Sequence, residues 1–229
     1  MTLLWWGMAI ALVIGLWRWS LGSATHARAA TIQVTLAVIA VAFNVVVPIS
    51  NVEASTLVVV CAALALGLRA SLVVAVLCVI GTDAVSGLGA WTLWQVIGFA
   101  VVGALAAGAV AAVRRVEAVH GRVRTRSVER TGLVVLVALL TLVYDVVVTV
   151  GTLPTLGVPA AAMSTHAIGA SLLLGLPFTL THMVSNGVLA FVGAEPLLRA
   201  LCRARRLLPL SGNQAGSAHG KDNDVRVAR

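Results

Sequence analysis

Polar side chains interrupt the apolar runs of this chain at a few regularly spaced positions. Thr141, Asp145 and Thr149 follow one another at four-residue intervals, which places them on one face of a helix. His182 and Asn186 repeat this spacing later in the chain. An ionisable group within an apolar run is costly, so it is a functional candidate. Carboxyl and imidazole groups there could bind polar parts of a small molecule or act as acid and base.

Other polar or aromatic side chains lie in the same setting. The full candidate set for substrate binding is Asn44, Asp83, Trp91, Trp94, Gln95, Tyr144, Asp145, His182 and Asn186. The plainer alternative is that the polar members pair with one another between helices, where each contact contributes roughly 1 kcal/mol. Neither histidine within the apolar runs has a Cys or acidic partner at metal-ligand spacing, so we expect no metal site.

The elements that position these side chains are long apolar segments. Of the 229 residues, 60% are hydrophobic and 10% are charged, too few charges to cover a soluble domain of this length. A spanning helix needs roughly 20 mostly apolar residues to cross a bilayer core about 30 Å thick. The runs are continuously apolar rather than alternating, which favours helices over a barrel. The sequence therefore predicts an all-α, multi-pass membrane helical bundle.

Seven apolar runs follow one another along the chain. The first, residues 3–21, carries tryptophans near both ends and predicts an extra N-terminal helix within residues 1–28. Six further runs form the predicted core at 29–206; they are residues 29–49, 56–68, 70–85, 91–113, 131–150 and 164–192. The last run is expected to be interrupted near residues 175–177, at Pro177. Residues 207–229 are polar and predict a disordered cytoplasmic tail.

Arginines divide the connections between these runs into two sets. Basic residues lie at Arg28, at Arg69, in 114–130 and in 199–206, which are alternate connections. Because basic connections stay on the cytoplasmic side of a cell membrane, the six core helices are predicted to start and end inside. The C-terminus is then cytoplasmic, and most candidate residues lie in the outer halves of the helices. There they could form one pocket that is open to the outside.

Several function classes lack their motifs in this sequence. The arginines form no patch interleaved with aromatic residues, so we expect no nucleic-acid binding. A nucleotide-binding P-loop is missing, as are the H-E-x-x-H and G-x-S-x-G motifs of proteases and hydrolases. We expect that the chain is not an enzyme, that it needs no cofactor, and that partners supply any transport energy.

One stretch resembles a known family of membrane proteins. Gly89, Trp91, Thr92, Trp94 and Gln95 match G-P-W-T-P-W-Q, which the substrate-binding S components of energy-coupling factor (ECF) importers carry before a glycine-rich helix. The prolines of that stretch are replaced here by Ala90 and Leu93. The resemblance covers about residues 31–206; within it, 53–68 looks like the short second helix, Tyr144-Asp145 like a polar pair of the fifth helix, and Pro177, His182 and Asn186 like part of the last helix.

The resemblance implies a six-helix fold with both ends inside and a role in vitamin uptake. The chain would capture a vitamin-like solute outside, then dock on a transmembrane T component and two ATPases. Trp91 and Trp94 would close the pocket and stack on a flat or macrocyclic solute, while Asp145 and His182 would fix its polar groups. The nearest branch is cobalamin-related; a thiamine precursor and a deazapurine are the other candidates. The family's alanines four apart in the first core helix are not kept at Ala37, Ala40 and Ala42, so docking could use another face.

Two other functions remain open from the sequence. Asp83, Asp145 and His182 could be acid and base groups of a membrane-embedded enzyme that acts on lipid or isoprenoid. Alternatively, the chain could be a non-catalytic membrane scaffold. Lipid turnover by the pure protein would favour the enzyme, and a neighbouring ATPase in the operon would favour the importer.

Overall fold

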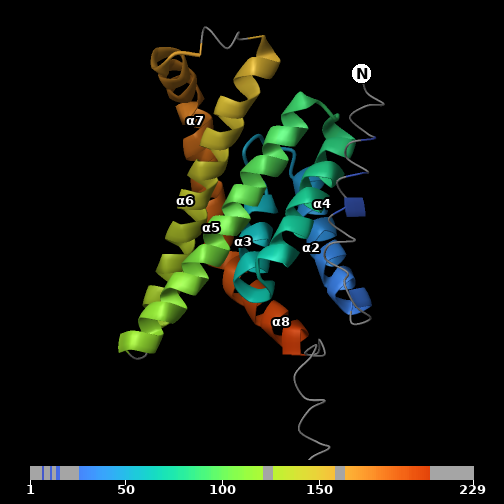
Figure 1. Ribbon diagram of the computed structural model, residues 1–229, viewed down its shortest axis with the longest axis vertical. Coiled ribbons are helices and arrows are strands. Elements are labelled where there is room, and N and C mark those ends of the chain that lie inside the picture. Colours follow the sequence, from blue (N-terminus) through green and yellow to red (C-terminus); the bar gives the residue numbers. More distant parts are fainter. Residues whose placement is uncertain are drawn as a thin grey trace, which may run out of the picture.

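A computed structural model of the protein describes residues 26–120, 126–157 and 163–206, with four isolated positions before them. Within these ranges the chain is helical apart from short connections, which confirms the predicted all-α bundle (Figure 1). The predicted N-terminal helix at residues 3–21, apart from those four positions, and the predicted tail at 207–229 lie outside the described residues.

Six helices make up the described part of the chain. They are α2 (His26–Val46), α3 (Ser55–Leu66), α4 (Leu68–Ser86), α5 (Ala90–His120), α6 (Arg126–Thr152) and a long last helix made of α7 (Thr165–Leu189), the π-helical turn η3 (Ala190–Ala194) and α8 (Glu195–Arg206). A 3-10 turn, η1 (Leu153–Leu156), follows α6. Five of the six helices are long and apolar enough to cross a membrane. The chain is therefore a multi-pass membrane protein.

The helices extend beyond the apolar runs that predict them. The sequence suggests a polar connection at 114–130, but α5 continues to His120 and α6 begins at Arg126. The predicted interruption near residues 175–177 is wrong, because α7 continues through Pro177. Proline removes only one backbone donor from a helix, and membrane helices tolerate it where the freed carbonyl finds another partner or a polar space.

The short helix α3 forms the centre of the bundle. Its sequence is apolar on every face, as expected of a helix that packs on all sides. Ten of its twelve residues are buried, and it contacts α2, α4, α5, α6, α7 and α8. Gly67 ends α3 with a φ of +94°, a conformation that favours glycine, and its N–H bonds the carbonyls of Ala62 and Ala63. As a result α4 begins directly after the turn.

Because α3 is short, it leaves room at one end of the bundle. Twelve residues rise about 18 Å, against a hydrocarbon core of about 30 Å. The connection 47–54 bridges the difference between the end of α2 and the start of α3. Polar backbone at this depth needs partners or a polar space, since lipid offers none.

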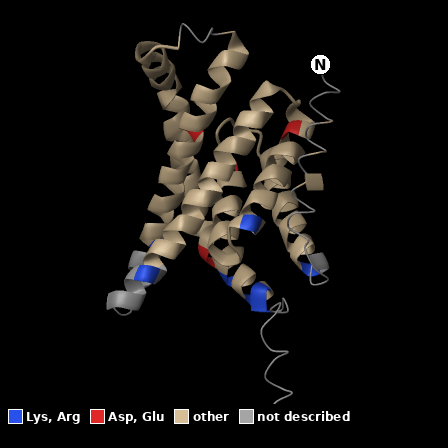
Figure 2. Ribbon diagram, viewed as in Figure 1, with Lys and Arg blue, Asp and Glu red and all other residues tan. Residues whose placement is uncertain are grey.

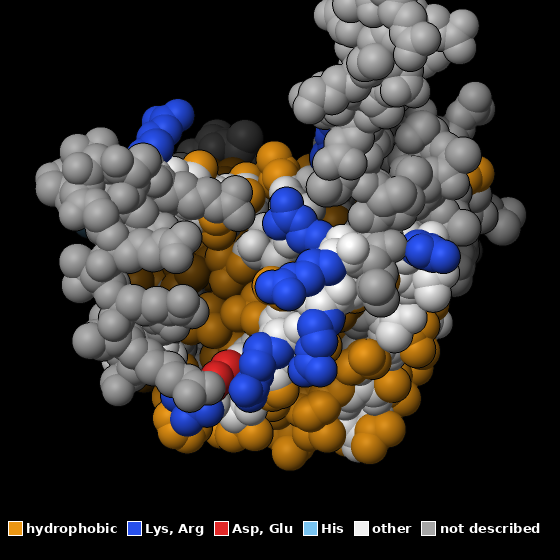
Figure 3. Space-filling view, turned by 90° about the horizontal axis from the view of Figure 1, so that it is seen from below, with side chains coloured by type: hydrophobic (Ala, Val, Ile, Leu, Met, Phe, Trp, Pro, Cys, Tyr) orange, Lys and Arg blue, Asp and Glu red, His pale blue; other side chains and the backbone are white. Residues whose placement is uncertain are grey.

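Charged side chains separate along the length of the bundle. The described arginines gather at one end, which we call the arginine end, where α2, α4 and α6 begin (Figure 2). A view onto that end shows basic side chains across the face and hydrophobic side chains around its rim (Figure 3). Arg130 and Glu195 join α6 to α8 there, with 3.1 Å between Nη2 and Oε2. Such segregation is typical of a protein whose flanks lie in lipid and whose ends lie in water.

Candidate functional site

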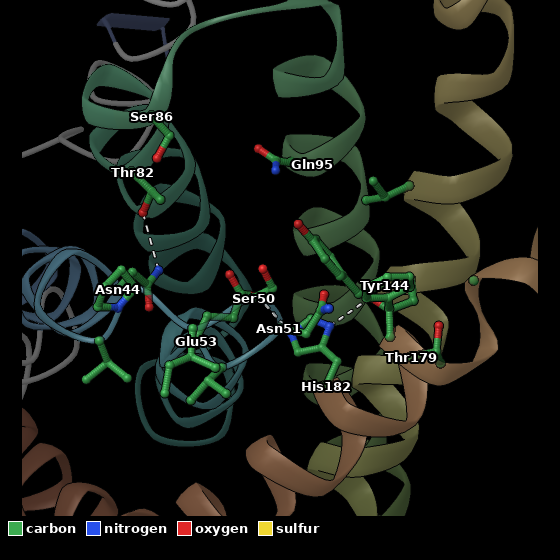
Figure 4. A pocket seen from close by; sticks show the side chains of 18 of the residues that line it. Asn44, Ser50, Asn51, Glu53, Thr82, Ser86, Gln95, Tyr144, Thr179 and His182 are labelled. Carbon is green, nitrogen blue, oxygen red and sulfur yellow. Dashed lines mark hydrogen bonds and ion pairs between the residues drawn. The ribbon is translucent and has the colours of Figure 1, made fainter.

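A cavity of about 610 Å³ lies in the half of the bundle away from the arginine end. Its wall is built from the end of α2, the connection 47–54, the end of α4, the start of α5, the last third of α6 and the middle of α7. Figure 4 shows polar side chains from these segments on both sides of an open space. The volume falls within the roughly 300–1,000 Å³ of small-molecule sites, so the cavity can hold a small organic solute.

Four helices place the cavity at a consistent depth. Each of these helices has an arginine near the arginine end and a polar residue of the cavity wall 13 to 17 positions away from it. The pairs are Arg28 and Asn44, Arg69 and Thr82, Arg130 and Asp145, and Arg199 and His182. At 1.5 Å per residue these separations are about 20 to 26 Å. The polar wall therefore lies in the far third of a hydrocarbon core about 30 Å thick.

His182 is held between two carboxyl groups. Its Nδ1 lies 2.8 Å from Asp145 Oδ1 on α6, and its Nε2 lies 3.2 Å from Glu53 Oε1 in the connection 47–54. His182 is 3% exposed, Asp145 15% and Glu53 23%. Carboxylates only accept hydrogen bonds, and a neutral imidazole has one N–H to donate. Both contacts are therefore hydrogen bonds only when the cluster holds at least one extra proton, on the imidazole or on a carboxyl group. We call these three residues the His182 cluster; it joins α7 to α6 and to the connection.

The His182 cluster keeps unused hydrogen-bonding capacity. Asp145 Oδ2 is buried and has no hydrogen-bond partner in the described part of the chain. A buried acceptor left without a donor costs roughly 1–3 kcal/mol. Both imidazole nitrogens already face carboxylate oxygens, so the cluster can offer a solute acceptors but no imidazole donor.

A second polar group, the Asn44 cluster, borders the same cavity. Asn44 Nδ2 donates to Ser55 Oγ at 2.9 Å and lies 3.3 Å from Thr82 Oγ1, while Asn44 Oδ1 accepts from the Ala54 N–H at 2.9 Å. These contacts tie α2 to the start of α3 and to α4. Asn44 lines the cavity as expected of a site residue, but its amide is occupied by the fold.

Asp83 lies behind the cavity wall rather than in it. Its side chain is buried, at 4% exposure, and its Oδ2 accepts from Thr92 Oγ1 at 2.5 Å. With the amide of Gln95 oriented to suit its neighbours, the Gln95 nitrogen donates to Asp83 Oδ2 at 2.9 Å. Gln95 itself lines the cavity. Asp83 therefore does not line the cavity itself, and it holds the Gln95 amide that does.

Three further predicted site residues also lie outside the cavity wall. Trp94 packs against Gly151 at the end of α6, and Trp91 packs against Gly89 with 46% of its surface exposed. Asn186 is fully buried and donates to the His182 carbonyl at 3.2 Å. The stacking role expected for both tryptophans does not fit this geometry.

The spacing of the residues on α5 explains why the tryptophans are elsewhere. Trp91 stands one turn before Gln95 on the same face of α5, next to the first residue of the helix, and it packs against Gly89 rather than into the cavity. Trp94 is turned about 100° from Gln95, toward α6. Only Gln95 therefore faces the cavity, although the three residues belong to one short motif.

Glu53 is the main site residue that the sequence analysis misses. It stands in the connection before α3 and lines the cavity together with Tyr144, Thr149 and Thr179. A signal was present, because Glu53 is one of only eight acidic residues in the chain. Glu53 also stands just before the run 56–68, which is too short to span the bilayer. A short helix that reaches the inner side leaves its other end below the outer surface, so Glu53 is expected at that depth.

Among the described residues, no group of three or more His, Cys, Asp or Glu side chains is placed to hold a metal ion. No known protein family, curated protein or solved structure matches the chain. The geometry itself is that of a binding site: a cavity of ligand size, aromatic wall groups in Tyr144 and Phe178, and a few polar groups at one depth.

Proposed function

We propose that this chain is the substrate-capture subunit of a membrane importer for a small polar nutrient. The single observation that carries the proposal is the cavity of about 610 Å³ whose wall includes the unsaturated His182 cluster. A bundle that only had to fold would be more stable if apolar side chains filled this space. Intramembrane ionisable groups around a cavity are instead typical of a solute site.

The orientation follows from the arginine end. If basic connections stay inside, the arginine end faces the cytoplasm and the cavity faces the outside of the cell membrane. The C-terminus is then cytoplasmic, because α8 ends among the arginines. A cavity that faces outward suits capture of a scarce nutrient rather than its export.

Partner ATPases would supply the energy for transport. The sequence lacks a P-loop, and the stretch from Gly89 to Gln95 resembles the S components of ECF importers. On that resemblance the partners are a transmembrane T component and two ATPases, and the solute is a vitamin or related micronutrient. A cobalamin-related solute stays a prediction of the resemblance.

The geometry gives less support to an enzyme. A general base needs a free imidazole nitrogen or carboxylate oxygen within hydrogen-bond reach of its substrate. Of the three acid and base candidates, Asp145 keeps an oxygen without a partner among the described residues, but that oxygen is closed to solvent. Both nitrogens of His182 already face carboxyl groups, and Asp83 is engaged by Thr92 and Gln95. A scaffold, in turn, would have no use for a cavity with unpaired acceptors.

The solute can be sought by mass spectrometry of small molecules released from the denatured, detergent-purified protein. We expect a stoichiometric organic compound from the wild type and much less from Asp145→Asn purified in the same way. Wild-type protein that releases no compound, or variant protein that releases an equal amount, would contradict solute capture at this cavity.

Cysteine labelling tests the orientation in intact cells. Cys61 and Cys78 are buried and Cys202 is exposed near the arginine end, so the wild type is its own control. A membrane-impermeant maleimide should label Ser50→Cys, at the cavity, from outside, and should not label the wild type until the cells are opened. Labelling of the wild type in intact cells would place the arginine end outside and reject the proposed orientation.

A further inference from the structure

We propose that the cavity selects solutes that carry a positively charged nitrogen, such as a protonated amine or an amidinium, and excludes anions. This inference rests on the proposed solute capture and deepens it, since it names the chemical class of the ligand.

The wall of the cavity is acidic. Glu53 and Asp145 line it, and no lysine or arginine is among the described residues of its wall. On α2, α4, α6 and the last helix, the arginines nearest the polar wall stand 13 or more residues away, about 20 Å or more along the helix axis. At that distance an arginine cannot form an ion pair with a solute in the cavity.

Counting protons gives the sign of the charge at the His182 cluster. Each imidazole contact is a hydrogen bond only if a proton lies between the nitrogen and the carboxyl oxygen, so the two contacts need two protons. A neutral imidazole with two carboxylates supplies one, so the cluster needs one extra proton. That cluster carries a net charge of −1, whether the extra proton belongs to the imidazole or to a carboxyl group. A positively charged solute would neutralise it, whereas an anion would add a second negative charge in a poorly solvated space.

Most of the side-chain N–H donors of the wall are already engaged. The Asn44 amide donates toward Ser55 and Thr82, the Gln95 amide donates to Asp83, and both His182 nitrogens face carboxyl groups. Apart from backbone N–H groups, what is left for an anion is the Asn51 amide and a set of hydroxyl groups. These neutral donors are weak compensation for desolvating a charge.

The acceptors of the wall are free where a cation needs them. Glu53 lines the cavity with 23% of its side chain exposed, and its contact with His182 uses only Oε1, so a charged donor can reach this carboxyl group. Asp145 adds its negative charge to the same wall, although its Oδ2, which has no partner within the described ranges, is closed to solvent. Tyr144 and Phe178 add aromatic rings to the same wall. Ring faces attract cations, and this attraction increases when the cation is desolvated.

Three probes of nearly equal shape can separate charge from size: benzamidinium, benzamide and benzoate. Their binding to the purified full chain can be followed by thermal shift. We expect benzamidinium to bind at least about tenfold more tightly than benzamide, with benzoate the weakest. Asp145→Asn and Glu53→Gln should each lose most of the preference for benzamidinium. Glu195→Gln removes the same charge at the arginine end, where Glu195 pairs with Arg130, and should keep the preference.

Several results would overturn the inference. They are equal or tighter binding of benzamide or benzoate, binding of none of the three probes, or a preference for benzamidinium that survives in both cavity variants. The proposed function fails differently, through a wild-type protein that releases no compound. A stoichiometric anionic compound released from the wild type would support solute capture and reject the cation preference.

Discussion

Two polar clusters border the same cavity, and they differ in how completely they are hydrogen-bonded. In the Asn44 cluster the amide donates to Ser55 and lies near Thr82, while its carbonyl accepts from Ala54. In the His182 cluster the imidazole is fully engaged, but Asp145 keeps one buried oxygen without a partner among the described residues. The first cluster connects three helices, and the second leaves capacity for a ligand.

The comparison teaches a way to separate structural from functional polar residues in a membrane bundle. Interhelical hydrogen bonds hold helices together at roughly 1 kcal/mol each, and they need no cavity. A buried acceptor without a donor destabilises the protein. Thr56 Oγ1 and Asn186 Oδ1 are also unpartnered among the described residues, but Asp145 is the one of the three that lines the cavity and carries a carboxyl group. Each variant below tests whether the two clusters differ in this way.

Asp145→Asn should produce the largest effect, on solute affinity. The amide can still accept from His182 and keep the cluster together, but it loses the charge that faces the cavity. We expect the affinity for the released solute to fall about 10- to 100-fold, or roughly 1.4–2.7 kcal/mol, as judged by equilibrium binding. Thr141→Val is a matched control, because Thr141 is one turn away on α6 and bonds its own helix at the Val137 carbonyl. Similar losses in both variants would contradict the special role of Asp145.

Asn44→Leu should act mainly on stability. The change leaves the Ala54 N–H and the Ser55 hydroxyl without their partner, which costs about 1–3 kcal/mol. Thermal unfolding of the detergent-purified protein would detect this loss, and the fraction that stays folded should bind the solute with nearly unchanged affinity. The proposed difference between the two clusters would be contradicted if Asn44→Leu lowered solute affinity as much as Asp145→Asn without lowering the unfolding temperature.

Trp91→Ala should have the smallest effect. Trp91 is half exposed and lies outside the cavity wall, against Gly89. Solute affinity should change less than about twofold, equivalent to about 0.4 kcal/mol, in the same binding assay. A tenfold loss would restore the stacking role that the sequence motif suggests, and it would move the solute site toward the start of α5.

Much of the fold could be predicted from the sequence. Continuous apolar runs and alternating basic connections predict the order of the helices. The described helices follow those runs to within a few residues, except where α5 and α6 extend into the basic connection and where the last helix continues through α8 to Arg206. Pro177 misleads because a proline that would break a helix in water is tolerated inside a membrane helix.

The site was predictable only in part, because it depends on relative depth. Asp145 and His182 stand out as ionisable residues in apolar runs, and the structure brings them within hydrogen-bonding distance. Glu53 is missed because its depth depends on how short α3 is, and the tryptophans mislead because a motif does not tell which of its members faces inward. Spare hydrogen-bonding capacity, the feature that distinguishes the two clusters, cannot be read from a sequence at all.

The central claim is that the unsaturated cluster holds the solute. The most direct measurement is an experimental structure of the purified protein with its released solute bound. We predict density for the solute in the cavity, with a donor group of the solute within hydrogen-bonding distance of the Glu53 or Asp145 carboxyl group. Solute density between Trp91 and Trp94 with an empty cavity would contradict that claim.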